Sequence, residues 1–151
     1  MGKKRNRIRE LKLKAPQSFW EASEEDVDKV TGGCGPGGVG DYLVPDTVWG
    51  LSIFLACRVH DWMYGECHKI AGLSEGIIYK RLADDWFLEN MYGIIEVAGC
   101  RLLRRLRRRR AKTYYWNVVQ FGDSSAGVSH GEKAVRRSVN TGVRQGGRSY
   151  A

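Results

Sequence analysis

One predicted helix near the middle of the chain carries an apolar stripe that turns polar halfway along, and this feature constrains the fold most. The stretch 47–69 contains no proline and follows Pro45-Asp46, where Asp46 can cap the first free backbone N–H groups. Residues at spacings of three and four share one face of this helix, namely Ile53, Ala56, Cys57, His60, Asp61, Tyr64 and Cys67. Because burying a charge without a partner is costly, we expect His60 and Asp61 to be paired or to bind a ligand.

A second helix is predicted from about Glu75, and it supplies a partner for His60. Its stripe consists of Ile77, Asp84, Phe87, Leu88, Met91, Ile94, Ile95, Ala98 and Leu102. Asp84 lies on this stripe, whereas Asp85 points about 100° away around the helix. If the two helices pack antiparallel, Asp84 can accept a hydrogen bond from one ring nitrogen of His60. The other ring nitrogen is then left as a base.

A glycine-rich run from Gly32 to Gly38 precedes the first of these helices. Glycine permits positive φ, so the carbonyl oxygens of such a loop can turn toward a common centre. Calcium prefers about six to eight oxygen ligands from carboxylates, carbonyls and water. We therefore expect a Ca²⁺ site formed by loop carbonyls and the carboxylate of Asp61.

Three motifs, in this order, are similar to those of the calcium-dependent phospholipases A2 of the secreted type. The loop motif is Cys34-Gly35-Pro36-Gly37-Gly38-Val39-Gly40, the helix motif is Cys57-Arg58-Val59-His60-Asp61-Trp62-Met63-Tyr64, and the partner motif is Ala83-Asp84. The chain most resembles the compact members from bacteria, phages and a parvovirus minor capsid protein, over about residues 31–100. The resemblance implies a mainly α fold, in which a calcium loop precedes two antiparallel helices that carry the active site.

The resemblance also implies roles for individual residues. His60 would remove a proton from the attacking water, Asp84 would orient His60, and Tyr64 would hydrogen-bond to Asp84. Calcium would be bound by Asp61 and by the carbonyl oxygens of Gly33, Gly35 and Gly37. The ion would polarise the sn-2 ester carbonyl of a phospholipid, helped by the backbone N–H of Gly35 at the oxyanion.

The four cysteines fit the resemblance in part. The loop and helix cysteines of the animal enzymes are disulfide-bonded, which implies a Cys34–Cys57 bond here. Other half-cystines of those enzymes are replaced by Ala56, Met63 and Ala83. Cys67 and Cys100 are not expected to pair, because Cys67 would face the region near Ile77 in an antiparallel helix pair.

Other interpretations of the same residues stay open. His60 could be an ordinary buried histidine with a satisfied hydrogen bond. Zinc could bind among Cys57, His60, Cys67 and His68, although structural zinc usually takes ligands from turns and not from along one helix. The glycine run could cradle phosphate, but no Gly-Lys-Ser/Thr follows it and no strand pattern precedes it.

The net charge of +8 hides an acidic centre between two basic ends. Residues 15–100 contain 5 basic and 14 acidic residues, and residues 101–151 contain 13 basic and 2 acidic residues. The run from Arg101 to Lys112 is predicted to extend the second helix, and it can bind either an anionic bilayer or nucleic acid phosphates. The alternative is a solvated, partly frayed helix end.

We divide the chain into four parts. These are a basic N-terminal arm (1–16), a phospholipase A2-like domain ending in the arginine-rich helix (17–112), an aromatic segment that is a short strand or a surface patch (113–121), and a flexible basic tail (122–151). Within the domain, Ser23 is expected to cap a short helix that ends near Thr31. The aromatic residues Trp49, Trp62, Trp86 and Phe87 are expected in the core, with lipid contact as an alternative for Trp62.

No signal peptide is predicted, because the first residues are charged, and no stretch is long and apolar enough to span a membrane. Export by another route, delivery inside a viral or phage particle, or origin from a longer protein would each account for a calcium enzyme without such segments. The sequence thus predicts a calcium-dependent phospholipase A2. The alternatives are an inactive module that binds membrane or nucleic acid through the arginine-rich helix, and a structural zinc protein.

Overall fold

Six helices and a two-stranded hairpin make up the part of the chain that the structure describes. The computed structural model describes residues 2–31, 47–70 and 72–122. In chain order the elements are α1 (Lys3–Glu10), α2 (Gln17–Glu21), α3 (Glu24–Val30), β1 (Thr47–Val48), β2 (Leu51–Ser52), α4 (Phe54–Cys67), α5 (Leu73–Val97) and α6 (Arg101–Phe121). The prediction of a mainly α fold is confirmed. Among these helices, none combines the length and the apolar composition needed to cross a bilayer.

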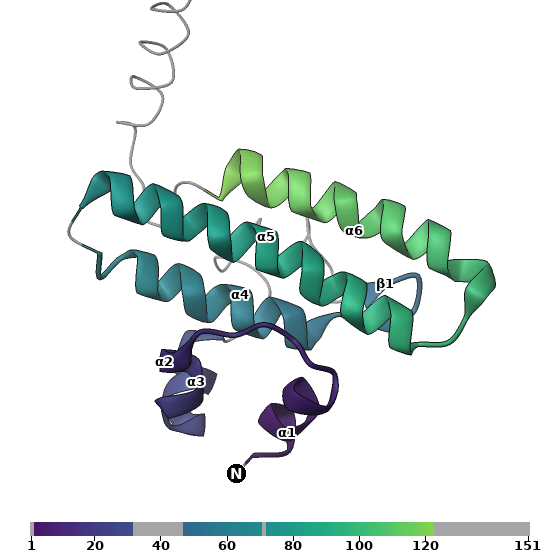
Figure 1. The fold of residues 1–151 in the computed structure, drawn as a ribbon, viewed down its shortest axis with the longest axis horizontal. Coiled ribbons are helices and arrows are strands. Elements are labelled where there is room, and N and C mark those ends of the chain that lie inside the picture. Colours follow the sequence, from purple (N-terminus) through teal and green to yellow (C-terminus); the bar gives the residue numbers. More distant parts are fainter. Residues whose placement is uncertain (1, 32–46, 71, 123–151) are drawn as a thin grey trace, which may run out of the picture.

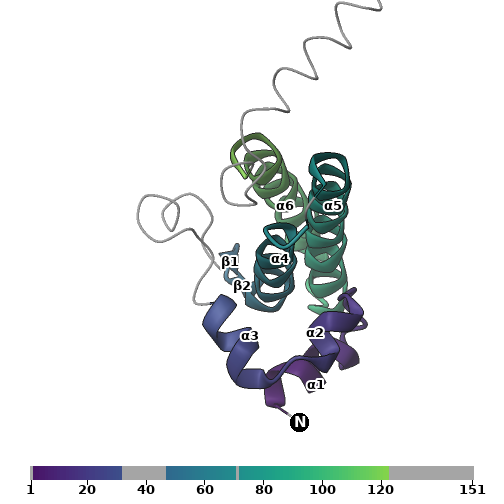
Figure 2. The same ribbon diagram turned by 90° about the vertical axis from the view of Figure 1, so that its left-hand side faces the viewer.

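Three long helices form the centre of the fold. The chain runs through α4, reverses into the antiparallel α5, and reverses again into α6, which lies alongside α5 (Figure 1). When the molecule is turned, α4 is seen between the α5–α6 pair and the short helices α1 to α3 (Figure 2). α4 therefore has neighbours on several sides, and most of its side chains are buried.

The helix expected over 47–69 begins later than predicted. Strands β1 and β2 pair as an antiparallel hairpin, and α4 begins only at Phe54. The two turn residues, Trp49 and Gly50, both have positive φ, at 49° and 70°, as the tight two-residue turn of a hairpin requires. The predicted helix cap, Asp46, lies outside the described residues.

The arginine-rich run does not extend α5, contrary to the sequence prediction. Gly99 adopts a positive φ of 68° between the two helices, and α6 folds back along α5. Glu96, just before this turn, pairs with two arginines of α6, because its carboxylate oxygens lie 3.1 Å from Arg104 and 2.8 Å from Arg108. The reversal therefore brings opposite charges together.

The aromatic segment 113–121 forms the last turns of α6, so the short-strand alternative is wrong. Tyr114 is buried in the core, and its hydroxyl donates to the carbonyl of Thr47 at 3.1 Å. Arg107, two turns earlier, donates to the carbonyl of Trp49 at 3.2 Å. These bonds attach α6 to the hairpin as well as to α5.

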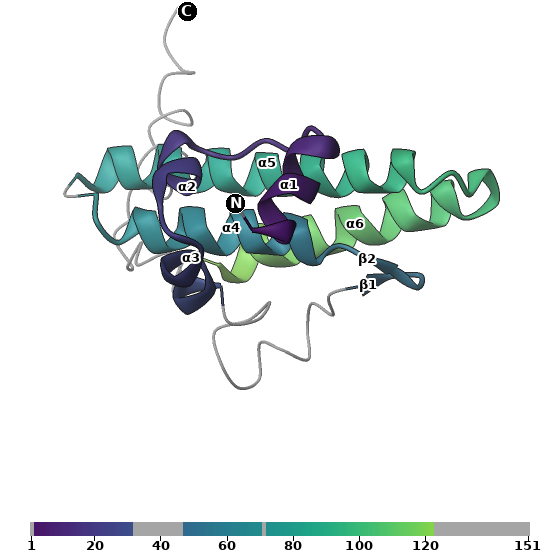
Figure 3. The ribbon, with the colours of Figure 1, turned by 90° about the horizontal axis from the view of Figure 1, so that it is seen from below.

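The basic N-terminal stretch, expected as an arm, is folded against the rest of the chain (Figure 3). Ile8 and Leu13 are buried in the core. The buried guanidinium of Arg5 donates to the carbonyl of Ala22 at 2.5 Å, which ties α1 to the end of α2. The backbone N–H of Lys14 donates to the side chain of Asn90 on α5 at 2.7 Å.

A buried arginine holds α3 against α4. Ser23 caps α3 as predicted, because its hydroxyl accepts the backbone N–H of Asp26 at 3.0 Å. Arg58 of α4 is almost fully buried, donates to the hydroxyl of Thr31 at 2.9 Å, and also pairs with the carboxylate of Asp28. The carboxylate of Glu24 lies 3.7 Å from the same guanidinium.

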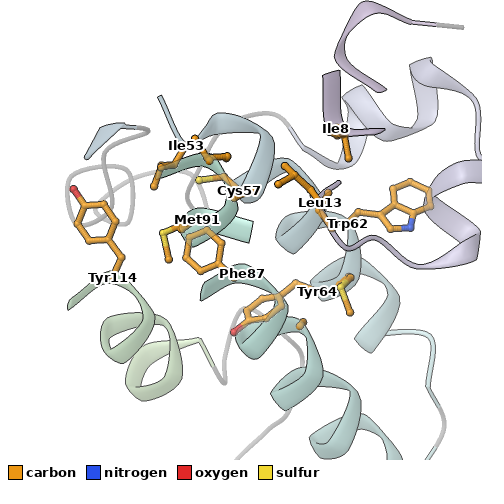
Figure 4. Close-up of a cluster of buried hydrophobic side chains, with 14 of the residues drawn as sticks. Ile8, Leu13, Ile53, Cys57, Trp62, Tyr64, Phe87, Met91 and Tyr114 are labelled. Atoms are coloured by element: carbon orange, nitrogen blue, oxygen red, sulfur yellow. The ribbon is translucent and has the colours of Figure 1, made fainter. Parts of the chain in front are cut away.

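One set of apolar side chains fills the space between the helices (Figure 4). It includes Ile8, Leu13, Ile53, Cys57, Trp62, Tyr64, Phe87, Met91 and Tyr114. Trp62 packs edge-on against Phe19 at a ring distance of 6.2 Å, so it is a core residue and too buried to contact lipid. Trp49, which was also expected in the core, stands at the hairpin turn and is 58% exposed.

Candidate active site

His60 of α4 and Asp84 of α5 meet between the two antiparallel helices. The Nε2 atom of His60 lies 3.2 Å from Oδ1 of Asp84, and both side chains are buried. Asp85, the neighbouring carboxylate, points outward and accepts a hydrogen bond from Tyr115 at 3.0 Å. The predictions that Asp84 is the inward carboxylate and that it lies opposite His60 are both confirmed.

Two further donors hold the carboxylate of Asp84. The hydroxyl of Tyr64 donates to Oδ1 at 2.5 Å, as the resemblance implied. The ammonium of Lys80 donates to Oδ2 at 2.8 Å and is itself buried. Lys80 is absent from the sequence prediction, although its position four residues before Asp84 on the same helix is a signal that could have revealed it.

These contacts determine which ring nitrogen of His60 is available as a base. An ionised carboxylate only accepts hydrogen bonds, so the Nε2 atom must carry the proton that it shares with Asp84. The Nδ1 atom then presents its lone pair. Within the described part of the chain, the Oδ1 atom of Asp61 lies 3.9 Å from Nδ1, beyond hydrogen-bond distance.

Aromatic rings fix the orientation of the imidazole. The ring of Tyr64 lies 4.0 Å from that of His60, and the ring of Phe87 lies 4.7 Å from it. The imidazole is thus packed against one ring from α4 and one from α5. Such packing keeps it aligned with Asp84 without further hydrogen bonds.

The electrostatic effects of the neighbours exceed that of burial at both members of the pair. Burial lowers the pKa of His60, but the nearby negative charges of Asp61 and Asp84 and the hydrogen bond to Asp84 outweigh burial, so the pKa of His60 is raised. Burial raises the pKa of Asp84, but hydrogen bonds from His60, Lys80 and Tyr64 outweigh it, so the pKa of Asp84 is lowered. Asp84 therefore stays ionised, as an orienting partner must.

The predicted calcium ligands are described only in part. Asp61 is 24% exposed at its side chain, next to the Nδ1 atom of His60. A carboxylate in this place suits a hard cation such as Ca²⁺. Gly33, Gly35 and Gly37 lie outside the described residues, so their part in the site stays a prediction.

The residues weighed as zinc ligands do not gather around a common point. Within 2–31, 47–70 and 72–122, no group of three or more His, Cys, Asp or Glu side chains could hold a metal ion. His68 is exposed at the end of α4, whereas Cys67 is buried, and burial raises the pKa of its thiol to about 11.

The cysteines agree with the sequence prediction as far as they are described. Cys67 and Cys100 are free thiols, as expected. Cys57 is buried in the core. Its predicted partner, Cys34, lies outside the described residues, so the Cys34–Cys57 pairing stays a prediction.

No family model, curated protein or solved structure matches the chain. Its function is therefore inferred from the three sequence motifs together with the surroundings of His60.

Proposed function

We propose that the protein hydrolyses the sn-2 ester of glycerophospholipids, with His60 as the base that activates water. One observation carries this proposal. Asp84 accepts the Nε2 proton of His60, so the Nδ1 atom is left as the basic nitrogen. Tyr64 and Lys80 also donate to Asp84. An ordinary core histidine does not need these two additional donors on its carboxylate partner, whereas a base that must keep one tautomer benefits from a carboxylate held in place.

The residues of the chain support each proton movement of the reaction. The Nδ1 atom accepts a proton from water as the water oxygen attacks the ester carbonyl carbon. Asp84 stabilises the resulting imidazolium, while Tyr64 and Lys80 keep the carboxylate in place. The imidazolium then returns the proton to the alkoxide of the departing lysophospholipid, which regenerates the base.

A calcium ion is part of this proposal. Asp61, with the carbonyl oxygens of Gly33, Gly35 and Gly37, would hold it, and when bound it supplies positive charge for the developing oxyanion. The backbone N–H of Gly35 is expected to donate to the same oxyanion.

The direct test is release of labelled fatty acid from the sn-2 position of phosphatidylcholine vesicles, with calcium or with a chelator. Wild type is expected to release product only with calcium, and His60→Ala is expected to release none. Asp84→Asn is expected to lose about a thousandfold or more in rate, because the amide cannot hold the imidazole as the charged carboxylate does.

Asp85→Asn is the matched control for Asp84→Asn. It removes the same charge from the next position, but its side chain is exposed and points away from His60. We expect it to retain full activity. Equal product release by wild type and His60→Ala would end the proposal.

A further inference from the structure

The outward side of α6 exposes apolar side chains along its length. Leu102, Leu106 and Trp116 are 87%, 40% and 58% exposed. Together with Arg109 and Thr113 they recur at alternating spacings of four and three, so they share one face of the helix. The opposite face, which includes the buried Ala111 and Tyr114, packs on the core.

Four basic residues border this apolar line. Arg101, Arg105, Arg109 and Lys112 are all exposed, and they follow one another at spacings of four, four and three. Among the described residues, no hydrogen-bond or ion-pair partner is found for the side chain of any of them. Their positive charge is therefore available to an external anion.

Several other basic side chains are paired within the described part of the molecule. On α6, Arg104 and Arg108 pair with Glu96, and Arg107 bonds to a carbonyl of the hairpin. On α1, Lys4 lies 3.0 Å from Asp28 and Arg7 lies 2.7 Å from Glu10. The side chains of Lys3 and Lys12 have no described partner either, but the outward face of α6 holds four such side chains along one helix.

None of the other described elements covers the outward face of α6. α6 lies on the side of the helix layer away from α1 to α3 (Figures 1 and 2). Residues 15–100 carry 5 basic and 14 acidic residues, a net charge of −9, so an anionic surface repels that part of the chain and attracts α6. Residues 1–14 are also basic, with 7 basic residues and 1 acidic residue, but α1 exposes no large apolar side chain, so α6 is the basic helix that can also insert apolar groups.

We propose that Leu102, Leu106, Trp116, Arg101, Arg105, Arg109 and Lys112 form a docking face for bilayers that contain anionic phospholipids. Leucine and tryptophan side chains enter the boundary between head groups and acyl chains, while arginine and lysine meet the phosphates. Nucleic acid phosphates would engage the cations only and would leave both leucines in water. The inference goes beyond hydrolysis, because docking requires neither His60 nor calcium.

The test is co-sedimentation of the full-length protein with vesicles in the presence of a chelator. Vesicles of phosphatidylglycerol and phosphatidylcholine are compared with vesicles of phosphatidylcholine alone. His60→Ala is the parent variant, so that the lipid stays intact, and wild type in chelator is run beside it. We expect binding to the anionic vesicles and little to the neutral ones.

Two sets of substitutions divide the docking face. Arg105→Gln, Arg109→Gln and Lys112→Gln together are expected to weaken binding by about a hundredfold, since each basic residue near an anionic surface contributes about 1 kcal/mol. Leu102→Ser, Leu106→Ser and Trp116→Ser together are expected to weaken it by about tenfold or more. All six side chains are exposed, so helix content by circular dichroism is expected to stay unchanged.

Matched controls remove the same groups elsewhere. Lys3→Gln, Arg7→Gln and Lys69→Gln lower the net charge by the same amount, and Ile78→Ser removes a 67% exposed apolar side chain from α5. Both controls are expected to bind like the parent. The proposal is overturned if the controls lose as much binding as the docking-face variants, or if neutral vesicles bind equally well. It is also overturned if a short DNA duplex displaces the vesicles and the serine variant binds that duplex unchanged.

Discussion

Lys80 and Asp84 lie one turn apart on α5, and the ammonium of Lys80 is 2.8 Å from the Oδ2 atom of Asp84. His60 and Tyr64 share the other carboxylate oxygen. A buried cation thus offsets the charge of a buried carboxylate, which lets Asp84 stay ionised between two helices. Lys80 is a positioning residue in this arrangement, because it acts on His60 only through Asp84.

Lys80→Met is expected to destabilise the fold by about 3 kcal/mol at neutral pH, because it leaves the charge of Asp84 without its main cation. The lowered pKa of Asp84 contributes stability above its unfolded value of 3.8 and loses that contribution as pH falls through the folded pKa. The difference from wild type should therefore shrink in acid. Urea unfolding at neutral and acid pH measures the free energy of unfolding of both proteins. The same difference at the two pH values would contradict the role given to Lys80.

Tyr64→Phe is expected to lower stability by about 1–2 kcal/mol and product release by about tenfold. It removes the 2.5 Å hydrogen bond to Asp84 but keeps the ring beside His60. Tyr115→Phe is the matched control, because it removes a hydrogen bond to the exposed Asp85 and should change stability by less than about 0.5 kcal/mol. Denaturant unfolding and the vesicle assay measure both variants, and equal losses would contradict the special place of Tyr64.

Gly122→Ala is expected to destabilise the protein by about 1–3 kcal/mol, because a β-carbon there would lie 2.5 Å from the hydroxyl of Tyr64 and 2.5 Å from the carbonyl of Val118. Gly76→Ala on α5 should instead stabilise it by about 0.5–1 kcal/mol, since no atom lies within 4 Å of the added carbon and alanine favours the helix. Melting temperatures of the two variants should move in opposite directions. A shift in the same direction would show that the crowding at position 122 is relieved easily.

Arg58→Leu is expected to cost about 1–3 kcal/mol and to loosen α3 selectively. Asp28 and Glu24 are partly exposed, so water can replace the lost guanidinium at both carboxylates. Hydrogen exchange should show lost protection in α3 and unchanged protection in α5. Lys4→Met, which removes the exposed partner of Asp28, serves as the control and should leave α3 protected.

The meeting of His60 and Asp84 could be predicted because it depends on local geometry. Helical spacing alone places His60 on the apolar stripe of α4 and separates Asp84 from Asp85 on α5. Two helices that bury such stripes have few ways to pack. The inward polar residues then have to meet, whatever the rest of the chain does.

The reversal before α6 could not be predicted in the same way. Ala98 and Leu102 continue the stripe of α5 in the sequence, and one glycine inside a helix costs only about 1 kcal/mol. What decides the turn at Gly99 is long-range, namely the pairing of Glu96 with arginines of α6 and the bond from Tyr114 to the hairpin.

The hairpin and the folding of the N-terminal stretch could not be predicted for a related reason. Gly50 signals a turn, but a tryptophan with positive φ beside it is rare, so the pattern of 47–69 favoured a continuous helix. In the basic N-terminal stretch, Ile8 and Leu13 stand among many charged residues, so the sequence pattern does not show that they are buried. The partner of Arg5 is a backbone carbonyl at the end of α2, which the sequence pattern does not indicate.

Gly122, just past the end of α6, lies so near Tyr64 that an added β-carbon would be 2.5 Å from the tyrosine hydroxyl. The helix that carries the docking face, α6, thus ends beside the tyrosine that donates to Asp84, the partner of His60. A displacement of the end of α6 would therefore change the surroundings of the Tyr64 ring. The ring-proton resonances of Tyr64 would report such a displacement when the outward face of α6 binds a surface.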